Sequence, residues 1–362
     1  MLGTIRQPTI ASPPVPPTIL NVVGNRPQFV KAAPVELALA GRANVLTVDS
    51  GQHYDRELAG VFYDELGLSA PRYRLDVGSG SHAVMTARIL ERMEPVILET
   101  DPSWVLVYGD TNTTLGAALT AAKLQVRVAH VEAGLRSFNR SMPEELNRLA
   151  VDAIADCLFA PSARAIENLA SEGRAAAAHL VGDVMVDAAR IFGPLADRDP
   201  VTPAGAGPYV LATVHREANT RPEALSRIVG SLRRIERPVV LPLHPRTRAV
   251  IEREGIDTTG LTITAPLGYL RFTALLRAAS VLVTDSGGAQ KEAYLPGTPC
   301  ITLRDETEWV ETVDLGWNRL VGTDAALLAR ALDAPSPTTA RPPVYGDGHA
   351  SERIAAILLA SA

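Results

Sequence analysis

The chain contains little cysteine and no long apolar run. Its two cysteines in 362 residues, Cys157 and Cys300, both lie within apolar stretches. Two isolated thiols cannot form a disulfide framework or a four-ligand zinc site, so we expect reduced core residues and no bound metal. No apolar run approaches the roughly 18 residues that a membrane-spanning helix requires, so no membrane association is expected.

An excess of positive charge is also missing. With 35 basic against 40 acidic residues the net charge is −5, and the isoelectric point is near 5.9. A nucleic-acid-binding domain would carry a basic patch, so nucleic acid is not an expected partner. Residues 1–17 hold five prolines but no apolar signal-peptide core. We predict a disordered extension there and a cytoplasmic location.

From residue 18 onward, short apolar runs alternate with stretches of helical periodicity. A content of 46% hydrophobic residues over this length favours two domains, each with its own core. Strands are predicted at residues 19–23, 45–48, 104–108, 126–131 and 157–160, and helices at 32–40, 81–98 and 115–124. Such alternation is typical of an α/β fold with parallel sheets and right-handed crossovers.

A second alternating set follows a break in the pattern. Residues 193–208, rich in proline, aspartate, glycine and alanine, are predicted to link a domain over 18–192 to one over 209–345. The second set has predicted strands at 209–214, 239–243, 261–264, 281–284 and 300–303, helices at 223–234 and 272–279, and a last helix at 350–359 within 346–362. Two Rossmann-like sheets of this kind would face a cleft, where the carboxyl ends of the strands form the usual ligand site.

The most informative segment is residues 284–292, with the sequence TDSGGAQKE. An apolar run stops at Asp285, and Ser286, Gly287 and Gly288 then open a helical pattern. Small residues at a strand-to-helix turn leave backbone N–H groups accessible at the positive end of a helix dipole of about half a charge. The segment therefore predicts a phosphate-binding site, and Glu292 follows where a carboxylate could accept hydrogen bonds from a ribose.

Polar clusters follow the other predicted strands in the same way. They contain Arg26 and Lys31 after the first strand, His53 after the second, Asp110 after the third, Glu132 and Arg136 after the fourth, and His215 in the second domain. Singly these residues have ordinary explanations, because Asp110 could cap a helix and Glu144 with Glu145 suits the first turn of one. If they converge on one cleft, a set of general acids and bases lies beside a diphosphate site, namely Asp110, Glu132, Glu144 and His215.

Other binding motifs are weak or absent from the sequence. Residues 78–83 (GSGSHA) match a dinucleotide-binding pattern, but only a weak predicted strand at 73–77 precedes them, and no acidic ribose ligand is identifiable. The sequence has no Walker loop, no zinc-protease helix motif and no nucleophile-elbow serine. We therefore expect no nicotinamide and no other cofactor.

At these residues the chain resembles the non-hydrolysing UDP-N-acetylglucosamine 2-epimerase family, from about residue 20 to residue 358. The segments that carry the resemblance are 24–34, 47–54, 109–115, 130–136, 143–148, 181–187, 213–216, 244–246, 284–292 and 303–311. The resemblance implies two Rossmann-like domains of the glycosyltransferase B type, with the last helix packed back on the first domain. It also implies a UDP-amino-sugar substrate and a homodimer.

The implied reaction inverts the configuration at C2 of the amino sugar. The C2 proton has no adjacent carbonyl, so either a cofactor oxidises the sugar or the bond to UDP breaks. Because no nicotinamide motif is convincing, the second route is favoured: UDP leaves from C1 while a base takes the C2 proton, giving a bound 2-acetamidoglucal. Reprotonation on the other face and return of UDP require acid–base groups on both sides of the ring and cations around the diphosphate.

By resemblance the carboxylates near the sugar are Asp110, Glu132 and Glu144, with His215 assisting departure of UDP. Arg26, Ser286, Gly287 and Gly288 would hold the phosphates, Glu292 the ribose and Phe272 the uracil, and Lys31, His53, Arg136 and Arg304 complete the substrate-binding set.

The chain departs from the family pattern at several positions. The usual GTRPE is GNRPQ at residues 24–28, and the usual TERPE is TEWVE at residues 307–311. The pairs Gln28-Phe29 and Glu308-Trp309 also resemble the branch acting on UDP-2,3-diacetamido-2,3-dideoxyglucuronate, which stays an alternative to UDP-N-acetylglucosamine. A glycosyltransferase of the same fold, in which the three carboxylates have no obvious task, and a non-catalytic nucleotide-sugar sensor are the other hypotheses.

Overall fold

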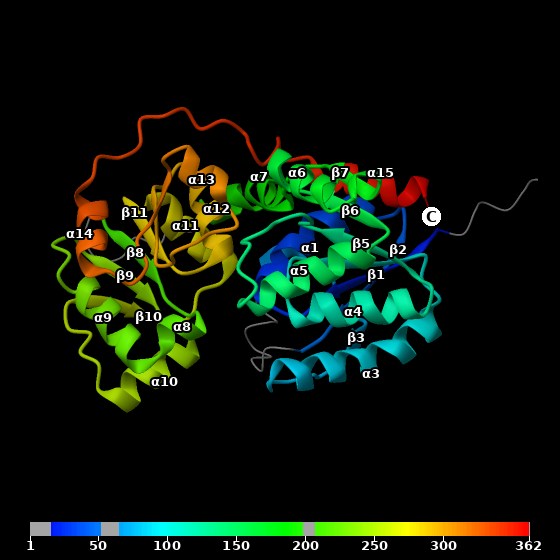
Figure 1. The fold of residues 1–362 in the computed structure, drawn as a ribbon, viewed down its shortest axis with the longest axis horizontal. Coiled ribbons are helices and arrows are strands. Elements are labelled where there is room, and N and C mark those ends of the chain that lie inside the picture. The colour runs from blue at the N-terminus through cyan, green and yellow to red at the C-terminus, as the bar shows by residue number, and fades with distance from the viewer. Residues whose placement is uncertain (1–15, 52–64, 198–206, 362) are drawn as a thin grey trace, which may run out of the picture.

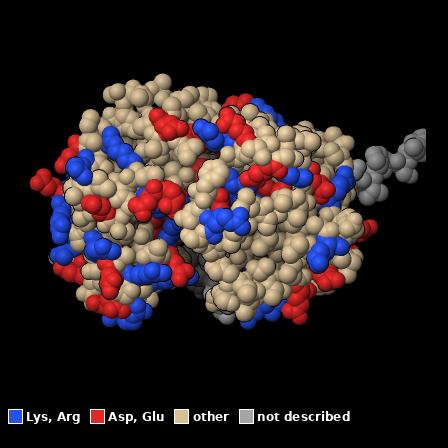
Figure 2. Space-filling view, viewed as in Figure 1, with Lys and Arg blue, Asp and Glu red and all other residues tan. Residues whose placement is uncertain are grey.

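The computed structural model describes residues 16–51, 65–197 and 207–361. Two lobes lie side by side, each a parallel sheet with helices on both faces (Figure 1). The surface is hollowed between the lobes, at the lower edge of the view in Figure 2. The predicted α/β class with two parallel sheets is confirmed.

The first lobe holds a seven-stranded sheet with the order β3-β2-β1-β4-β5-β6-β7 within the described residues. Its strands are β1 (Thr18–Val23), β2 (Asn44–Asp49), β3 (Tyr73–Arg74), β4 (Trp104–Tyr108), β5 (Arg127–Val131), β6 (Cys157–Ala160) and β7 (Ala178–Leu180). Its helices are α1 (Arg26–Leu39), α3 (His82–Thr100), α4 (Asn112–Lys123), α5 (Pro143–Ile154), α6 (Ala163–Ser171), the 3-10 turn η1 (Ala175–Ala177) and α7 (Val184–Ala196).

The second lobe holds a six-stranded sheet with the order β10-β9-β8-β11-β12-β13 in the part of the chain that is described. Its strands are β8 (Val210–Thr213), β9 (Val239–Pro242), β10 (Leu261–Thr264), β11 (Val281–Thr284), β12 (Cys300–Thr302) and β13 (Asn318–Leu320). Its helices are α8 (Glu217–Thr220), α9 (Pro222–Leu232), α10 (Pro245–Glu254), α11 (Tyr269–Ala278), α12 (Gly287–Tyr294), α13 (Val310–Asp314) and α14 (Ala325–Asp333).

The strand order determines where ligands can enter. In the first sheet the order reverses between β1 and β4, and in the second between β8 and β11. The central strands of both sheets are buried on both faces, which is why they read as continuous apolar runs in the sequence. At a reversal point, loops leave the carboxyl ends of neighbouring strands in opposite directions, and a crevice opens between them.

The chain returns to the first lobe at its end. After α14 it crosses over the top of the molecule in Figure 1 to α15 (Ala350–Ala360), which lies against α1 and α7. Ile354 and Leu358 pack into the same core cluster as Leu39 and Trp104, and the Trp104 indole donates to the Leu358 carbonyl at 3.2 Å. The C-terminal helix is thus part of the first hydrophobic core.

Most predicted strands match the observed ones, whereas several helix ends differ. Helix α1 begins at Arg26 instead of residue 32, because Asn25 caps it and Pro27 sits in its first turn. Helix α7 continues to Ala196, inside the range 193–208 that composition predicts as a linker. The short edge strands β7 and β13 were not predicted from the sequence, since three residues carry too little pattern.

Both cysteines are buried and unpaired, in β6 and β12, as predicted for core residues. Among the described residues, no helix is long and apolar enough to cross a membrane.

Candidate active site

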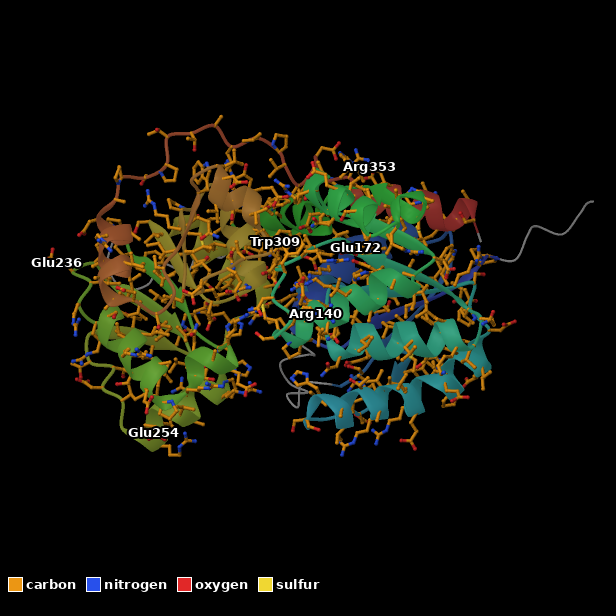
Figure 3. All side chains as sticks on the ribbon, viewed as in Figure 1. Arg140, Glu172, Glu236, Glu254, Trp309 and Arg353 are labelled. Atoms are coloured by element: carbon orange, nitrogen blue, oxygen red, sulfur yellow. The ribbon has the colours of Figure 1, made fainter. Side chains whose placement is uncertain are left out.

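Polar side chains of both lobes meet where β4 and β5 end in the first lobe and where α12 begins in the second. The lobes touch directly at this place, because the ammonium group of Lys291 in α12 lies 2.5 Å from Glu132 Oε1, directly after β5. Figure 3 shows Trp309 where the second lobe meets the first, and Arg140 on the loop that precedes α5. Glu132, which follows β5, and Lys291, which lies in the helix after β11, are therefore brought together.

Glu132 is the most constrained residue of the site. Its backbone adopts a left-handed φ of 72° directly after β5, a conformation that non-glycine residues rarely adopt without a compensating interaction. Its carboxylate is paired with both Lys31 and Lys291. Burial alone would raise the pKa of Glu132, but the two ammonium groups outweigh burial and hold the pKa at about 2. Glu132 is therefore a fixed anion.

Lys291 extends this arrangement into a buried cluster of four charges. Besides Glu132 it pairs with Asp183, the residue that caps α7. Its ammonium group also lies 4.2 Å from the centre of the Trp309 ring, within the range of a cation–π contact. Lys31, Glu132, Lys291 and Asp183 together carry two positive and two negative charges, so the cluster is neutral overall while joining elements of both lobes.

Asp110 lies beside this cluster but differs from Glu132 in its environment. The interpretation of Asp110 as a helix cap is wrong, because Thr111 caps α4 in a capping box with Thr114. The Asp110 carboxylate pairs with Arg148 of α5 at 2.7 Å, and 31% of its side chain is accessible. Desolvation by the surrounding protein raises the pKa of Asp110, and the opposing effects of Arg148 and Lys31 do not cancel the rise. Of the two carboxylates, Asp110 is thus the one better suited to exchange a proton.

The two glutamates of the first turn of α5 have different surroundings. Glu145 is buried and accepts hydrogen bonds from the backbone N–H groups of Ser137 and Phe138, each at 2.9 Å, and from Arg148 at 3.0 Å. It therefore holds the loop before α5 in place. Glu144 is half-buried, and no ion-pair partner is found for it in the described parts of the chain.

The start of α12, where the sequence predicts an anion site, is a serine-capped helix end. Ser286 caps the helix by accepting from Ala289 N at 3.4 Å, and its own N–H donates to Thr284 Oγ1 at 3.0 Å. The N–H groups of Gly287 and Gly288 belong to the first turn, where a helix has no internal acceptors for its N–H groups. Gly287 leaves no room for a side chain, since an added Cβ would collide with Glu308 Oε1.

His215 and Asp285 form the neighbouring part of the second lobe. Asp285 is fully buried and accepts from the backbone N–H groups of His215 and Arg216 at 3.0 to 3.1 Å. His215 Nδ1 lies 3.4 Å from Asp285 Oδ1, while 44% of the His215 side chain is accessible. The buried carboxylate thus fixes the orientation of an accessible imidazole.

The comparisons with known proteins agree with this geometry. Residues 36–359 match the family model for UDP-N-acetylglucosamine 2-epimerase. The chain belongs to this family. It is 46% identical over 351 residues to the UDP-2,3-diacetamido-2,3-dideoxy-D-glucuronate 2-epimerase of Pseudomonas aeruginosa, covering 94% of this chain and 99% of that protein. The chain is accordingly an epimerase, an enzyme of the isomerase class.

Solved structures give the same result for the fold. The crystal structure of Methanocaldococcus jannaschii UDP-GlcNAc 2-epimerase in complex with UDP-GlcNAc and UDP superposes with a TM-score of 0.89 at 37% identity, covering 94% of this chain and 99% of that one. The calicheamicin glycosyltransferase, at 14% identity, superposes with a TM-score of 0.54 and shows likeness of fold alone. The predicted glycosyltransferase B-type architecture is confirmed.

Three further predicted residues of this epimerase are Arg26 in α1, Glu292 in α12 and Phe272 in α11. Burial lowers the pKa of Arg26 to about 10 even though Glu292 and Glu65 oppose the shift. Burial also raises the pKa of Glu292, against the influence of Lys291 and Arg26. Phe272 is half-buried in the first turn of α11, packed on the core of the second lobe. Arg26 and Glu292 are therefore electrostatic neighbours.

Arg136 and His53 do not join this group. All three guanidinium nitrogens of Arg136 already have partners, chiefly Glu172 at 2.6 and 2.8 Å and Asp152 at 2.8 Å. With 3% of the residue exposed, Arg136 braces α5 and α6 in the epimerase and is not open to a ligand. His53 lies outside the described residues.

Sequence reasoning missed three residues of the epimerase site, namely Lys291, Arg148 and Glu308. Each lies inside a segment that carries the family resemblance, so the motifs contained them without revealing their partners. Lys291 pairs with a residue 159 positions away, and Arg148 with one 38 positions away. A buried lysine or arginine on the inward face of a helix is the signal that could have singled them out, since such residues are almost always paired.

Proposed function

We propose that the protein interconverts UDP-N-acetylglucosamine and UDP-N-acetylmannosamine without net hydrolysis. The observation that carries the proposal is a pair of unlike, interacting carboxylates, Asp110 and Glu132, in a chain of this epimerase family. Glu132 also pairs with Lys291 of α12 in the second lobe. One carboxylate has a raised pKa and the other a lowered one, a division typical of sites that combine proton transfer with charge stabilisation.

The reaction proceeds by loss and return of UDP. The bond from C1 to the bridging oxygen breaks, with its electron pair leaving on UDP, while the C2 proton passes to a carboxylate. Anti elimination gives a bound 2-acetamidoglucal, and syn re-addition delivers a proton to the opposite face of C2 and UDP to C1. The raised pKa of Asp110 suits proton transfer, with half-buried Glu144 as the second carboxylate for proton transfer.

Glu132 has a different task in this scheme. As the C1–O bond opens, positive charge develops at C1, and a permanent anion near the ring stabilises it. The lysines on either side keep Glu132 ionised and hold it in one position, so little reorganisation is needed when the charge appears.

The second lobe binds the nucleotide in this proposal. The N–H groups of Gly287 and Gly288, capped by Ser286, receive the diphosphate together with Arg26 and Arg304. Glu292 holds the ribose and Phe272 lies beside the uracil. His215, oriented by Asp285, assists the departure of UDP, and we expect His215→Ala to slow turnover at least a hundredfold. Lys31 holds the Glu132 carboxylate in place, and Arg136 supports the site indirectly through its ion pair with Glu172.

A second sugar is supported by a specific observation. The relative from Pseudomonas aeruginosa at 46% identity is named for UDP-2,3-diacetamido-2,3-dideoxy-D-glucuronate, and the same 2-epimerisation could act on that uronate here. Measuring kcat/KM for the two UDP-sugars side by side decides between them. A homodimer is also proposed, and light scattering at several protein concentrations tests it.

Incubation in heavy water tests the reaction itself. UDP-N-acetylglucosamine without any acceptor should gain deuterium at C2 and form the manno epimer. With oxygen-18 in the bridge between C1 and the phosphate, the label should scramble into the non-bridging positions of the β-phosphate. Deuterium incorporation without scrambling would contradict cleavage of the C1–O bond. If neither deuterium incorporation nor scrambling occurs, but the sugar is transferred to an added acceptor, the protein would be a glycosyltransferase.

A further inference from the structure

A carboxylate of the second lobe, that of Glu308, lies against the first turn of α12. Glu308 Oε1 lies so close to Gly287 that a Cβ on that glycine would collide with it. Glu308 Oε2 accepts a hydrogen bond from Arg304 Nη2 at 2.9 Å. The residue is 8% exposed, so the carboxylate is buried and is not free in solvent. An anion therefore already lies against the first turn of α12, where the helix dipole favours negative charge.

Arg304 is only partly used by this contact. Its Nε and Nη1 are buried and have no hydrogen-bond partner among the described residues, and the residue is 6% exposed. Its Nη1 lies 3.7 Å from the position that a Cβ on Gly287 would take, so the guanidinium also faces the start of α12. Buried guanidinium nitrogens without partners are rare in folded proteins and call for a ligand with several acceptor oxygens.

The carboxylate of Glu308 is ionised in this position. Burial would raise the pKa of Glu308, but Arg304 and Arg148 outweigh burial and lower it. Glu308 also interacts unfavourably with the negative charge of Asp110 across the cleft. A diphosphate entering the same place would add two or more negative charges beside it, which costs free energy at short range.

We propose that Glu308 is a placeholder for the diphosphate: without ligand it occupies the anion position at the first turn of α12 and binds Arg304, and UDP must displace it. Displacement frees the whole guanidinium of Arg304 for phosphate oxygens. Glu308 thus lowers the affinity for the nucleotide. Without ligand, its carboxylate also supplies a negative charge to two positive groups, the Arg304 guanidinium and the N-terminal end of α12. The inference rests on the proposed nucleotide site and goes beyond it in naming the group that competes for it.

Calorimetric titration with UDP, without turnover, tests the placeholder. Glu308→Gln keeps the shape and removes the charge, and Glu308→Ala removes the occupant; both should bind UDP about tenfold more tightly than the wild type. Glu306→Gln is the matched control, since it removes the same charge from the same loop while its partner is Asn139. This control should bind UDP within about twofold of the wild type.

Uridine distinguishes a charge effect from a general change in the site. Its affinity should be the same in the wild type and in both Glu308 variants, because it carries no phosphate. In the Glu308→Gln background, Arg304→Gln should weaken UDP binding about tenfold, since the guanidinium would by then bind only phosphate. UDP binding that is unchanged or weaker in both Glu308 variants, or uridine binding that shifts as much as UDP binding, would overturn the proposal. A wild-type protein that binds no UDP would instead overturn the proposed function.

Discussion

The two lobes bring opposite kinds of polar group to the site. In the first lobe the charged side chains are matched, because Asp110 pairs with Arg148 and Glu132 with Lys31. In the second lobe, hydrogen-bond donors lack acceptors among the described residues. Two guanidinium nitrogens of Arg304 have no partner among those residues, and the first turn of α12 has N–H groups without acceptors inside the helix. The difference fits the proposed division of labour, in which the first lobe carries out the chemistry and the second binds the diphosphate.

Lys291 is an exception to this comparison between the lobes. It belongs to the second lobe but completes the charge balance of the first, through Glu132 and Asp183. The position of the Glu132 carboxylate therefore depends on contact between the lobes.

Glu132→Gln should have the largest effect and would break the matched cluster of the first lobe. It leaves two buried ammonium groups facing Asp183 alone. Removing one partner of a buried ion pair typically costs roughly 3–5 kcal/mol of stability, and turnover should fall at least a hundredfold. Chemical denaturation and epimerisation assays measure the two effects. A variant as stable as the wild type would show that the cluster contributes little, and one of near-normal rate would remove Glu132 from the catalytic set.

Acid should weaken the same cluster in a defined pH range. The pKa of Glu132 is about 2 in the folded protein against an ordinary 4.5, so the stabilisation is complete above pH 4.5 and is lost as the pH falls towards 2. The expected loss is about 3 kcal/mol, from the difference between the two pKa values. Comparing denaturation of the wild type and Glu132→Gln across this range isolates the contribution, because all other carboxylates are common to both. Parallel curves would contradict it.

Asp110→Asn should separate chemistry from stability. Asparagine can still accept from Arg148, and the position is partly accessible, so the fold should be kept. Without a titrating group of raised pKa, turnover and deuterium exchange at C2 should both fall at least a hundredfold. Asp101→Asn, at the exposed end of α3, is the control and should behave as the wild type. Near-normal exchange in Asp110→Asn would assign the proton transfer to another carboxylate.

The sequence predicted the parts of this comparison that depend on local pattern. The strands at 104–108 and 281–284 are apolar runs that end in polar clusters, so both the sheets and the position of the site at their carboxyl ends follow from the sequence. The glycines of α12 were recognisable because close backbone approach to a ligand requires them.

The pairings between distant residues could not be predicted in the same way. Whether an acid such as Asp110 caps a helix or faces a cleft depends on a neighbouring threonine, Thr111, that can cap equally well. Arg136 follows a strand as the binding residues do, yet the packing of α6 brings Glu172 to it and removes it from the cleft. Such outcomes depend on tertiary distances, which residue type and spacing do not encode.

Gly287→Ala should have the smallest effect of these changes and sharpens the description of the second lobe. Without ligand, the added methyl group would collide with Glu308 Oε1. In the complex with UDP, it would collide with the diphosphate that replaces the Glu308 carboxylate. Helix α12 itself should tolerate alanine, because Gly287 has a helical conformation and alanine has the higher helix propensity. UDP affinity should therefore fall roughly tenfold. Stability should change little, because the displacement of the buried Glu308 carboxylate offsets the gain in helix propensity. Gly288→Ala is the matched control, since its Cβ would meet only Glu292 Oε1, at the ordinary distance of 3.7 Å, and its UDP affinity should change less than about threefold. Equal losses in the two variants would mean that the diphosphate approaches the whole turn evenly, and the close fit at Gly287 would then have no special part in binding.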